Sequence, residues 1–270
     1  MCFVVTRSSV GSTFVSTDGV SFSSVAFSSG LLSGMVPTYW QSVRVDIVTA
    51  HDRPNTPREA IEIQETLRGL VDLEDRCPQE ILTVTGLDVA YDEPSGLIAA
   101  AAVTLDTSGF RVVEERTVVS RVSFPYEPGL FAFRELPPLL DALRALDHPP
   151  DLLVCDGHGL AHPRRFGLAC HVGVVTGLPS IGVGKTRFIG EHDEPGRERG
   201  SRAPLLDDGE VVGAVLRTRD EVKPVYVSVG HKISLDRACR EVLRLCPAFR
   251  QPETTRHADR LARDALKEVL

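Results

Sequence analysis

The sequence predicts an α/β protein with a mixed central sheet flanked by helices. Three apolar runs, 82–90, 97–105 and 112–122, follow one another, and the tight-turn sequence DTSG joins the last two, which predicts an antiparallel meander. A helical pattern comes next, and a short apolar run at 152–155 then has the composition of a buried strand. This order of three strands, a helix and a strand is the basis of the fold prediction.

The remaining elements follow from caps and apolar periodicity. Thr56, Pro57 and Glu59 form a capping-box helix start, and the helix is expected to be structural. Its predicted apolar face is Ile63, Leu67, Leu70 and Val71, and that of the helix presenting Glu135 is Leu139, Leu140, Leu143 and Leu146. Later segments predict a helix at 166–176, short strands at 180–183, 211–217 and 224–229, and two final helices. Neither the apolar pattern nor the turn signals reveal an internal repeat.

Length and composition favour one domain. With 270 residues and 42% hydrophobic content, the chain can bury one α/β core. The first 37 residues contain ten serines, and their apolar runs are too short for a secretory signal. We therefore expect 1–37 to be a poorly ordered extension, with Met35 as an alternative start, and 38–270 to be the catalytic domain.

Charge and cysteine usage limit the class of protein. The formal net charge of −7 argues against nucleic-acid binding by bulk positive charge, so any such site must be local, for example around Arg164, Arg165, Lys185 and Arg187. The six cysteines form no CxxC pair, which favours reduced thiols and a cytoplasmic protein. No apolar run approaches the roughly 18 residues of a membrane span.

The segment DLLVCDGHGLAHPRRFG, 151–167, has the pattern of an active-site edge. Its strand ends at Asp156, where open α/β sheets usually hold their chemistry. Gly157 and Gly159 allow the backbone to approach a ligand closely. His162 and the two following arginines are donors suited to phosphate.

Two further acids complete a possible metal site. Asp88 lies near the end of an apolar strand, and Glu135 lies on the helix that follows a Pro/Gly turn. Three acids from three elements suit a hard divalent cation, and such a cation activates water and stabilises charge at a phosphodiester. Each acid alone is more often a solvated carboxylate. A zinc pair of His158 and His162 would need a helix, which the glycines and Pro163 forbid. His171 and His231 are expected to be structural hydrogen-bonding residues.

Six motifs in order resemble the endonuclease V family, the nucleases that nick nucleic acid beside deaminated adenine. The resemblance extends over about 40–270 and depends on GLDVAY, PYEPGLFAFRE, DGHGLAHPRRFGLACHVG, IGVGKTR, SVGHKISLD and TRHAD. It implies a ribonuclease H-like fold, as the element order also does. It further implies Mg²⁺, with Mn²⁺ as a substitute, held by Asp88, Glu135 and Asp156. The implied supporting ligand is Asp259, for which helix capping is the alternative, and Lys185 and His162 are the implied neighbours of the scissile phosphate. Gly184 stands where the family usually has alanine.

The resemblance also assigns the PYEPG loop. Its prolines and Gly129 stiffen it, so that Tyr126, next to Pro125, is expected to act as a wedge stacking on a base. A surface tyrosine capping the helix is the alternative. The altered base is expected to be read by backbone groups near 86–87 and 157–160.

The expected activity is a nick at the second phosphodiester bond 3′ to deoxyinosine in DNA, leaving a 3′-hydroxyl and a 5′-phosphate. The expected partner is inosine-containing DNA, bound by a monomer away from membranes. The alternatives are cleavage of inosine in RNA or single strands, another ribonuclease H-like nuclease, and an inactive nucleic-acid-binding module. Intact acids argue against the last, and PYEPG argues against other nucleases.

Overall fold

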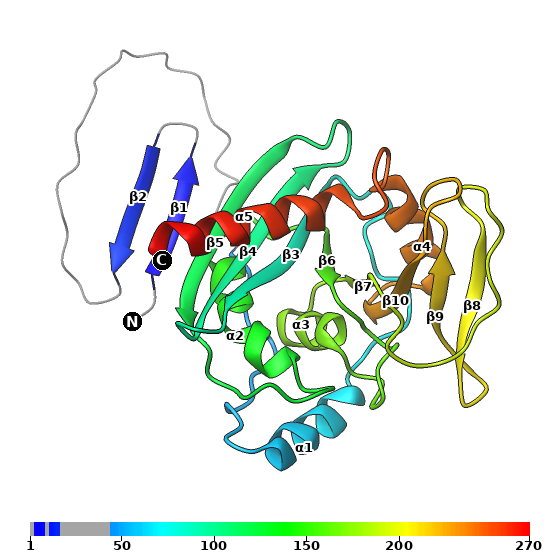
Figure 1. The fold of residues 1–270 in the computed structure, drawn as a ribbon, viewed down its shortest axis with the longest axis horizontal. Helices are drawn as coiled ribbons and strands as arrows, with labels where there is room; N and C mark the ends of the chain where they lie inside the picture. Colours follow the sequence, from blue (N-terminus) through cyan, green and yellow to red (C-terminus); the bar gives the residue numbers. More distant parts are fainter. Residues whose placement is uncertain (1–2, 9–10, 17–43) are drawn as a thin grey trace.

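The computed structural model describes residues 3–8, 11–16 and 44–270 (Figure 1). Most of the predicted N-terminal extension, with the candidate start Met35, lies outside the described residues. The described parts of that segment form two strands that the sequence had not predicted, β1 (Phe3–Ser8) and β2 (Gly11–Ser16). β1 pairs antiparallel with β2 on one side and with β5 on the other.

The described strands form one mixed sheet in the order β2-β1-β5-β4-β3-β6-β7-β10-β9-β8. The predicted meander is confirmed, since β3, β4 and β5 pair antiparallel in sequence order. β6 then pairs parallel with β3 and with β7. Within 44–270, the sequence did not predict β8, whose pattern is interrupted by Pro204. The bounds are β3 Thr83–Asp92, β4 Leu97–Asp106, β5 Val112–Arg121, β6 Leu152–Asp156, β7 Ser180–Gly184, β8 Arg202–Asp207, β9 Glu210–Leu216 and β10 Val225–His231.

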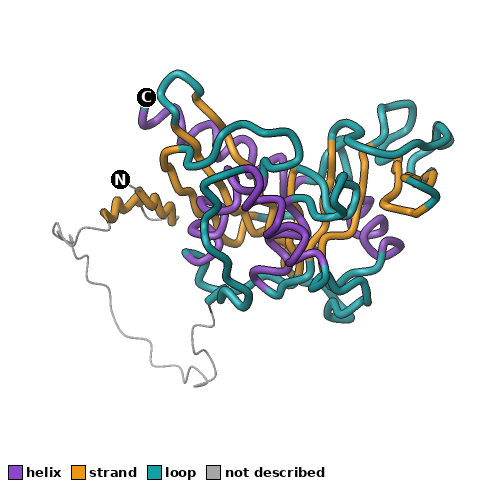
Figure 2. The backbone as a smooth tube through the Cα atoms, turned by 90° about the horizontal axis from the view of Figure 1, so that it is seen from below, coloured by secondary structure: helices purple, strands orange, loops and turns teal. Residues whose placement is uncertain are grey.

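Helices cover both faces of the sheet (Figures 1 and 2). Helices α2 and α3 pack on one face, α4 and α5 pack on the other, and α1 packs against α3. The bounds are α1 Pro57–Arg68, α2 Ala132–Arg144, α3 Leu168–Thr176, α4 Leu235–Arg244 and α5 Glu253–Val269. No helix in the described part of the chain is long and apolar enough to cross a membrane.

Small side chains on β4 explain how two helices approach one strand. Ala100 and Ala102 face α2, whereas Ala99 and Ala101 face α5, because successive side chains alternate between the two sides of a strand. On the neighbouring strand, a Cβ at Gly86 would lie 2.2 Å from the backbone of Thr254 at the start of α5. Helix α5 is therefore seated directly on the strand that carries Asp88.

The capping prediction for α1 is confirmed. The Thr56 side chain accepts from the Glu59 amide, and the Glu59 carboxylate accepts from the Asn55 amide. The helix ends at Arg68, so Leu70 lies beyond it and is exposed. The face that packs inward is Ala60, Gln64 and Leu67.

Candidate active site

Strand register brings two of the predicted acids together. β3 and β6 are parallel, and their last paired residues are Leu87 and Cys155, so Asp88 and Asp156 are the next residues at the same sheet edge. Asp156 also pairs with Val183 of β7, and Lys185 follows that strand. The Lys185 ammonium group forms a short ion pair with the Asp156 carboxylate. These three groups therefore lie close together, although Asp88 stands within β3, which continues to Asp92, and not near its end as the sequence predicted.

The third acid comes from α2. The helix begins at Ala132, so Glu135 lies in its first turn. The Tyr91 hydroxyl, from β3, donates to Glu135 Oε1 at 3.0 Å. Burial raises the pKa of Glu135 to about 7, with the charge of Asp156 adding to the rise and the Tyr91 hydrogen bond opposing it. Glu135 and Asp156 line the same cavity.

The site lacks enough positive charge for its carboxylates. Burial and the charge of Asp156 raise the pKa of Asp88 to about 9. Asp88 Oδ1 accepts from the Val89 amide, but its Oδ2 is buried with no hydrogen-bond partner among the described residues. Burial lowers the pKa of Lys185, but the hydrogen bond and charge of Asp156 outweigh it, so the net pKa is raised. Three acids are balanced against the Lys185 ammonium group and the charge of Arg134, which acts on Glu135.

This donor set fits a divalent cation. No group of three or more His, Cys, Asp or Glu side chains within the described residues is arranged as a finished metal site. The unpartnered oxygen of Asp88 and the raised pKa values of Asp88 and Glu135 both show carboxylates that a cation would stabilise. Carboxylate oxygens are also the ligands that Mg²⁺ prefers.

Asp259 lies next to this group without joining the cavity. Its carboxylate forms an ion pair with Arg263 at 2.8 Å on α5 and lines a separate polar hollow with Arg256 and Arg260. Its charge nevertheless acts on Lys185 and raises the pKa of that ammonium group. The position suits a supporting ligand more than a primary one.

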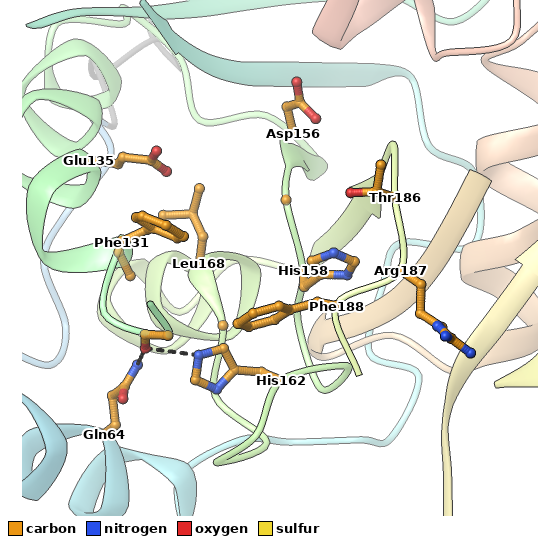
Figure 3. A pocket seen from close by; sticks show the side chains of 14 residues that line it. Gln64, Phe131, Glu135, Asp156, His158, His162, Leu168, Thr186, Arg187 and Phe188 are labelled. Atoms are coloured by element: carbon orange, nitrogen blue, oxygen red, sulfur yellow. Dashed lines mark hydrogen bonds between the residues drawn. The ribbon is translucent and has the colours of Figure 1, made fainter. Parts of the chain in front are cut away.

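A cavity of about 260 Å³ opens beside Glu135 and Asp156. Figure 3 shows these two carboxylates on one side of the cavity and Gln64 and His162 on the opposite side. Two rings lie between them, from Phe131 and Phe188 (Figure 3). The other lining residues are Gly129, Ala132, Gly157, His158, Gly167, Leu168, Thr186 and Arg187. We call the side with Glu135 and Asp156, together with neighbouring Asp88 and Lys185, the acid end.

The opposite side, which we call the loop end, consists of Gln64, Gly129, His162 and Arg164. All three side chains bond the carbonyl of Gly129, from Gln64 Nε2 at 3.1 Å, His162 Nε2 at 2.9 Å and Arg164 at 2.8 Å. Gly129 has φ +78°, which a residue with a side chain rarely adopts. The loop is therefore fixed from three directions.

His162 is neutral in this arrangement. Its Nε2 donates to the Gly129 carbonyl, and its Nδ1 accepts from the Arg164 amide at 3.2 Å. Burial lowers the pKa of His162 to about 4. The sequence predicted a histidine that orients a phosphate or water, and the structure shows one that holds the loop and lines the cavity.

Two predicted phosphate donors have other contacts. The Arg164 guanidinium bonds Gln64 Oε1 at 2.6 Å as well as Gly129, so it belongs to the loop end. Arg165 forms an ion pair with Asp207 at 2.7 Å and lines a different hollow, so the structure does not bring it to the cavity. Arg187 lines the cavity and is exposed, with its guanidinium directed away from the carboxylates (Figure 3).

The predicted wedge is exposed but supported. Tyr126 is 66% exposed, and the adjacent Pro125 is also exposed. The Tyr126 ring packs edge-on against Phe131 at 4.8 Å, and the Arg134 guanidinium lies 5.9 Å from its centre. Phe131 and Arg134 thus hold the Tyr126 ring at the surface of the PYEPG loop, outside the core.

The glycines predicted near the base divide into two groups. Gly157 lines the cavity. Gly159 packs against the Val229 carbonyl, and its amide donates to Ser228 Oγ at 2.8 Å. At the other predicted position, Gly86 packs on α5 and Leu87 is fully buried in the core. Of these predicted positions, only the segment around Gly157 and His158 reaches the cavity.

Several cavity residues were missed from the sequence. Gln64 is a polar residue on the inward face of α1, between Ala60 and Leu67, and that pattern was the available signal. Phe131 stands within the quoted PYEPGLFAFRE motif, whereas Phe188 had no signal beyond following KTR. The His158 ring also packs where a Cβ at Gly184 would come within 2.3 Å of it, so the glycine makes room for this ring.

His171 and His231 form hydrogen bonds, as predicted for structural residues. His158 and His162 lie outside any helix. His171 bonds His51 Nε2 at 2.7 Å, and His231 Nδ1 accepts from the Asp72 amide. The described cysteines are free, and four of the five are buried.

Comparison with known proteins identifies the family. The family model described as Endonuclease V matches residues 65–260. Endonuclease V of Nocardia farcinica is 58% identical over 214 residues, which cover 79% of this chain and 94% of the relative.

Solved structures agree with this match. The crystal structure of Endonuclease V from Streptomyces avermitilis is 54% identical with a TM-score of 0.78, and the match covers 84% of this chain and 99% of that one. Ciona intestinalis Endonuclease V, in complex with DNA containing an inosine followed by a ribo-adenosine, is 27% identical with a TM-score of 0.70, covering 79% of this chain and 98% of that one. The fold is ribonuclease H-like, and the chain belongs to the endonuclease V family.

Proposed function

We propose that this chain is a metal-dependent endonuclease that hydrolyses the second phosphodiester bond 3′ to a deoxyinosine in DNA. The products are a 3′-hydroxyl and a 5′-phosphate, and the role is repair of deaminated adenine. Family membership and the inosine-containing DNA bound by the Ciona relative support the substrate class.

One observation carries the proposal. Glu135 and Asp156 line the same cavity whose other walls include the rings of Phe131 and Phe188. A base that leaves the duplex and enters this cavity brings the backbone beside it to the acid end. Base recognition and phosphodiester hydrolysis can then occur on adjacent nucleotides.

Asp88, Glu135 and Asp156 would hold the cation, with Asp259 as a supporting ligand. When bound, Mg²⁺, or Mn²⁺ in its place, supplies a more acidic water and neutralises charge on the phosphate. The excess of buried carboxylates over the single ammonium group supports this assignment.

The residues of the chain bind and orient the reacting groups. Lys185 is half-exposed beside Asp156, so its ammonium protons are available to a non-bridging oxygen of the scissile phosphate. Water adds to phosphorus, the bond from phosphorus to the 3′ oxygen breaks, and that oxygen takes up a proton. The ion pair with Asp156 keeps Lys185 charged and directed at the site.

The PYEPG loop supplies access to the lesion. Tyr126, next to Pro125, would stack on the bases where the altered nucleotide leaves the duplex. The three bonds to the Gly129 carbonyl hold the base of this loop against the cavity. Gly157 and Arg187 are the further nucleic-acid contacts that we propose. Arg164 acts indirectly, because its bond to the Gly129 carbonyl holds the loop.

We propose that the protein acts as a monomer in the cytoplasm. The test of function is cleavage of matched oligonucleotides with and without inosine, as DNA and as RNA, in Mg²⁺ or in EDTA. Mg²⁺-dependent nicking of inosine-containing DNA on the 3′ side is the expected result.

Other outcomes identify the alternatives. Preference for inosine-containing RNA would make the chain an endoribonuclease, and equal cleavage without inosine would indicate another ribonuclease H-like nuclease. Binding without cleavage in any condition would indicate an inactive nucleic-acid-binding module.

A further inference from the structure

Arg134 contacts two tyrosines that serve different regions of the site. Its guanidinium lies 4.8 Å from the centre of the Tyr91 ring and 5.9 Å from that of Tyr126. It also forms an ion pair with Glu93 at 3.3 Å. The side chain is 5% exposed, although its charge would normally be solvated. A cation buried between two rings is held there by their faces.

The first of these rings, that of Tyr91, contacts the Glu135 carboxylate. The Tyr91 hydroxyl donates to Glu135 Oε1, and this hydrogen bond restrains the carboxylate on its helix. Partners of this kind fix the orientation of a ligating carboxylate, and their loss typically costs about 10- to 100-fold in metal affinity or activity. Tyr91 is thus suited to position Glu135.

The second ring lies at the surface. Tyr126 is exposed, and its described ring contacts are with Phe131 and Arg134. An exposed ring that must separate the strands of a duplex needs support from beneath. Arg134 offers that support from a position one residue before Glu135.

We propose that Arg134 is a shared positioning residue, which directs the Tyr91 hydroxyl toward Glu135 and supports the Tyr126 ring at the surface. This inference rests on the proposed function of the site. It goes beyond that function because it assigns one residue, Arg134, to both metal binding and strand separation. Tyr91 acts only on the first, and Tyr126 acts only on the second.

Three variants of the full chain separate these roles. Metal binding is measured by calorimetric titration with Mn²⁺ in the absence of DNA. Strand separation is measured as the ratio of single-turnover nicking rates on single-stranded and duplex inosine substrates. Tyr91→Phe should weaken Mn²⁺ binding by about tenfold or more and leave the ratio unchanged. Tyr126→Ala should change the ratio and leave Mn²⁺ binding unchanged.

Arg134→Met should change both readouts. The methionine keeps an apolar stem in the buried position but removes the cation, so Mn²⁺ binding should weaken and the ratio should shift, each by about two- to fivefold for one cation–π contact. Arg134→Lys, which keeps the charge and loses the planar group, should give the same pattern more weakly and serves if the methionine variant does not fold. Thermal melts confirm folding.

Matched controls lie away from these contacts. Thr66→Val removes a hydroxyl that bonds the Glu62 carbonyl on α1, and Arg144→Met removes an exposed arginine from the same helix as Arg134. Both should leave the two readouts unchanged. A folded Arg134 variant that changes only one readout, or neither, would overturn the proposal. If the wild type binds Mn²⁺ but does not nick inosine substrates, the proposed function is wrong. The Mn²⁺ titration of the Arg134 variants then still tests whether Arg134 positions Tyr91.

Discussion

The two ends of the cavity differ in how their polar groups are satisfied. At the loop end, Gln64, His162 and Arg164 all bond the Gly129 carbonyl, and His162 is neutral. At the acid end, Asp88 has a buried oxygen without a partner among the described residues, and burial together with the charge of Asp156 raises the pKa values of Asp88 and Glu135. The polar groups of the loop end are paired within the protein, whereas we propose that a cation and a phosphate complete the acid end. We therefore expect the loop end to be rigid, and we expect catalysis at the acid end to depend on the bound cation and phosphate.

The largest expected effect tests the acid end. Asp88→Ala, Glu135→Ala and Asp156→Ala should each lower the nicking rate by more than about 100-fold, beyond the range for loss of an outer partner. DNA binding should be largely retained, because each change removes metal coordination more than phosphate contact. The measurements are nicking in Mg²⁺ and gel shift in Ca²⁺.

Asp259→Ala provides the internal comparison for these variants. Its effect should be milder, since its carboxylate lines a separate hollow and reaches the site through its charge on Lys185. Normal nicking by a folded Asp88, Glu135 or Asp156 variant would contradict the assignment of the acid end.

A smaller effect is expected between the two ends, at the wedge. Tyr126→Ala should lose about 1–3 kcal/mol of binding to duplex DNA containing inosine, the range of base–aromatic stacking. The loss should be smaller on single strands, where no unpairing is needed, and Tyr126→Phe should retain most activity because the ring stacks. Equal losses on duplex and single strand would show that Tyr126 only supports the loop.

Substitutions at the loop end should change the free energy of unfolding more than the nicking rate. Gln64→Leu leaves the Arg164 side chain without one of its acceptors, and a lost buried partner costs about 1–3 kcal/mol in free energy of unfolding. Urea unfolding of this variant, compared with the exposed substitution Gln79→Leu, measures the effect. An unchanged midpoint for Gln64→Leu would show that the loop does not depend on this contact.

The neutral state of His162 predicts a pH dependence at the loop end. Burial lowers the pKa of His162 from 6.5 to about 4, so unfolding takes up a proton below pH 6.5. The stability contributed by the neutral ring is fully present above 6.5 and is lost as the pH falls toward 4, by at most about 1.4 kcal/mol per pH unit.

His162→Gln isolates this contribution, because glutamine keeps a donor for the Gly129 carbonyl but does not titrate. The free energy of unfolding of wild type should fall more than that of the variant between about pH 7 and about pH 5. His171 and His231, whose pKa values are also lowered, are present in both proteins. Identical pH profiles would mean that His162 is not held neutral.

The smallest effect is expected outside both ends. A chain that begins at Met35 lacks β1 and β2. Of these two strands, β1 pairs with β5, and neither strand lines the cavity. Its nicking rate should be close to that of the full chain, and a thermal melt should show little loss. A large loss in both would show that the pairing of β1 with β5 stabilises the domain.

The sequence by itself predicted which acids form the acid end. Asp156 ends β6, whereas Asp88 lies within β3, directly after its last buried residue, Leu87, and buried runs of this kind are local features that composition and periodicity reveal. Capping residues likewise predicted the start of α1. The family resemblance added the functional roles of Lys185, Asp259 and Tyr126.

Tertiary structure decided which polar side chains face the cavity. Arg164 and Arg165 are adjacent in sequence, yet Arg164 bonds Gln64 of α1 and the Gly129 carbonyl, whereas Arg165 pairs with Asp207 of β8. Gln64 reaches the Gly129 carbonyl, 65 residues away, only after α1 packs on α3. Hydrogen bonds between distant segments have no sequence period, so the loop end could be recognised only in the folded chain.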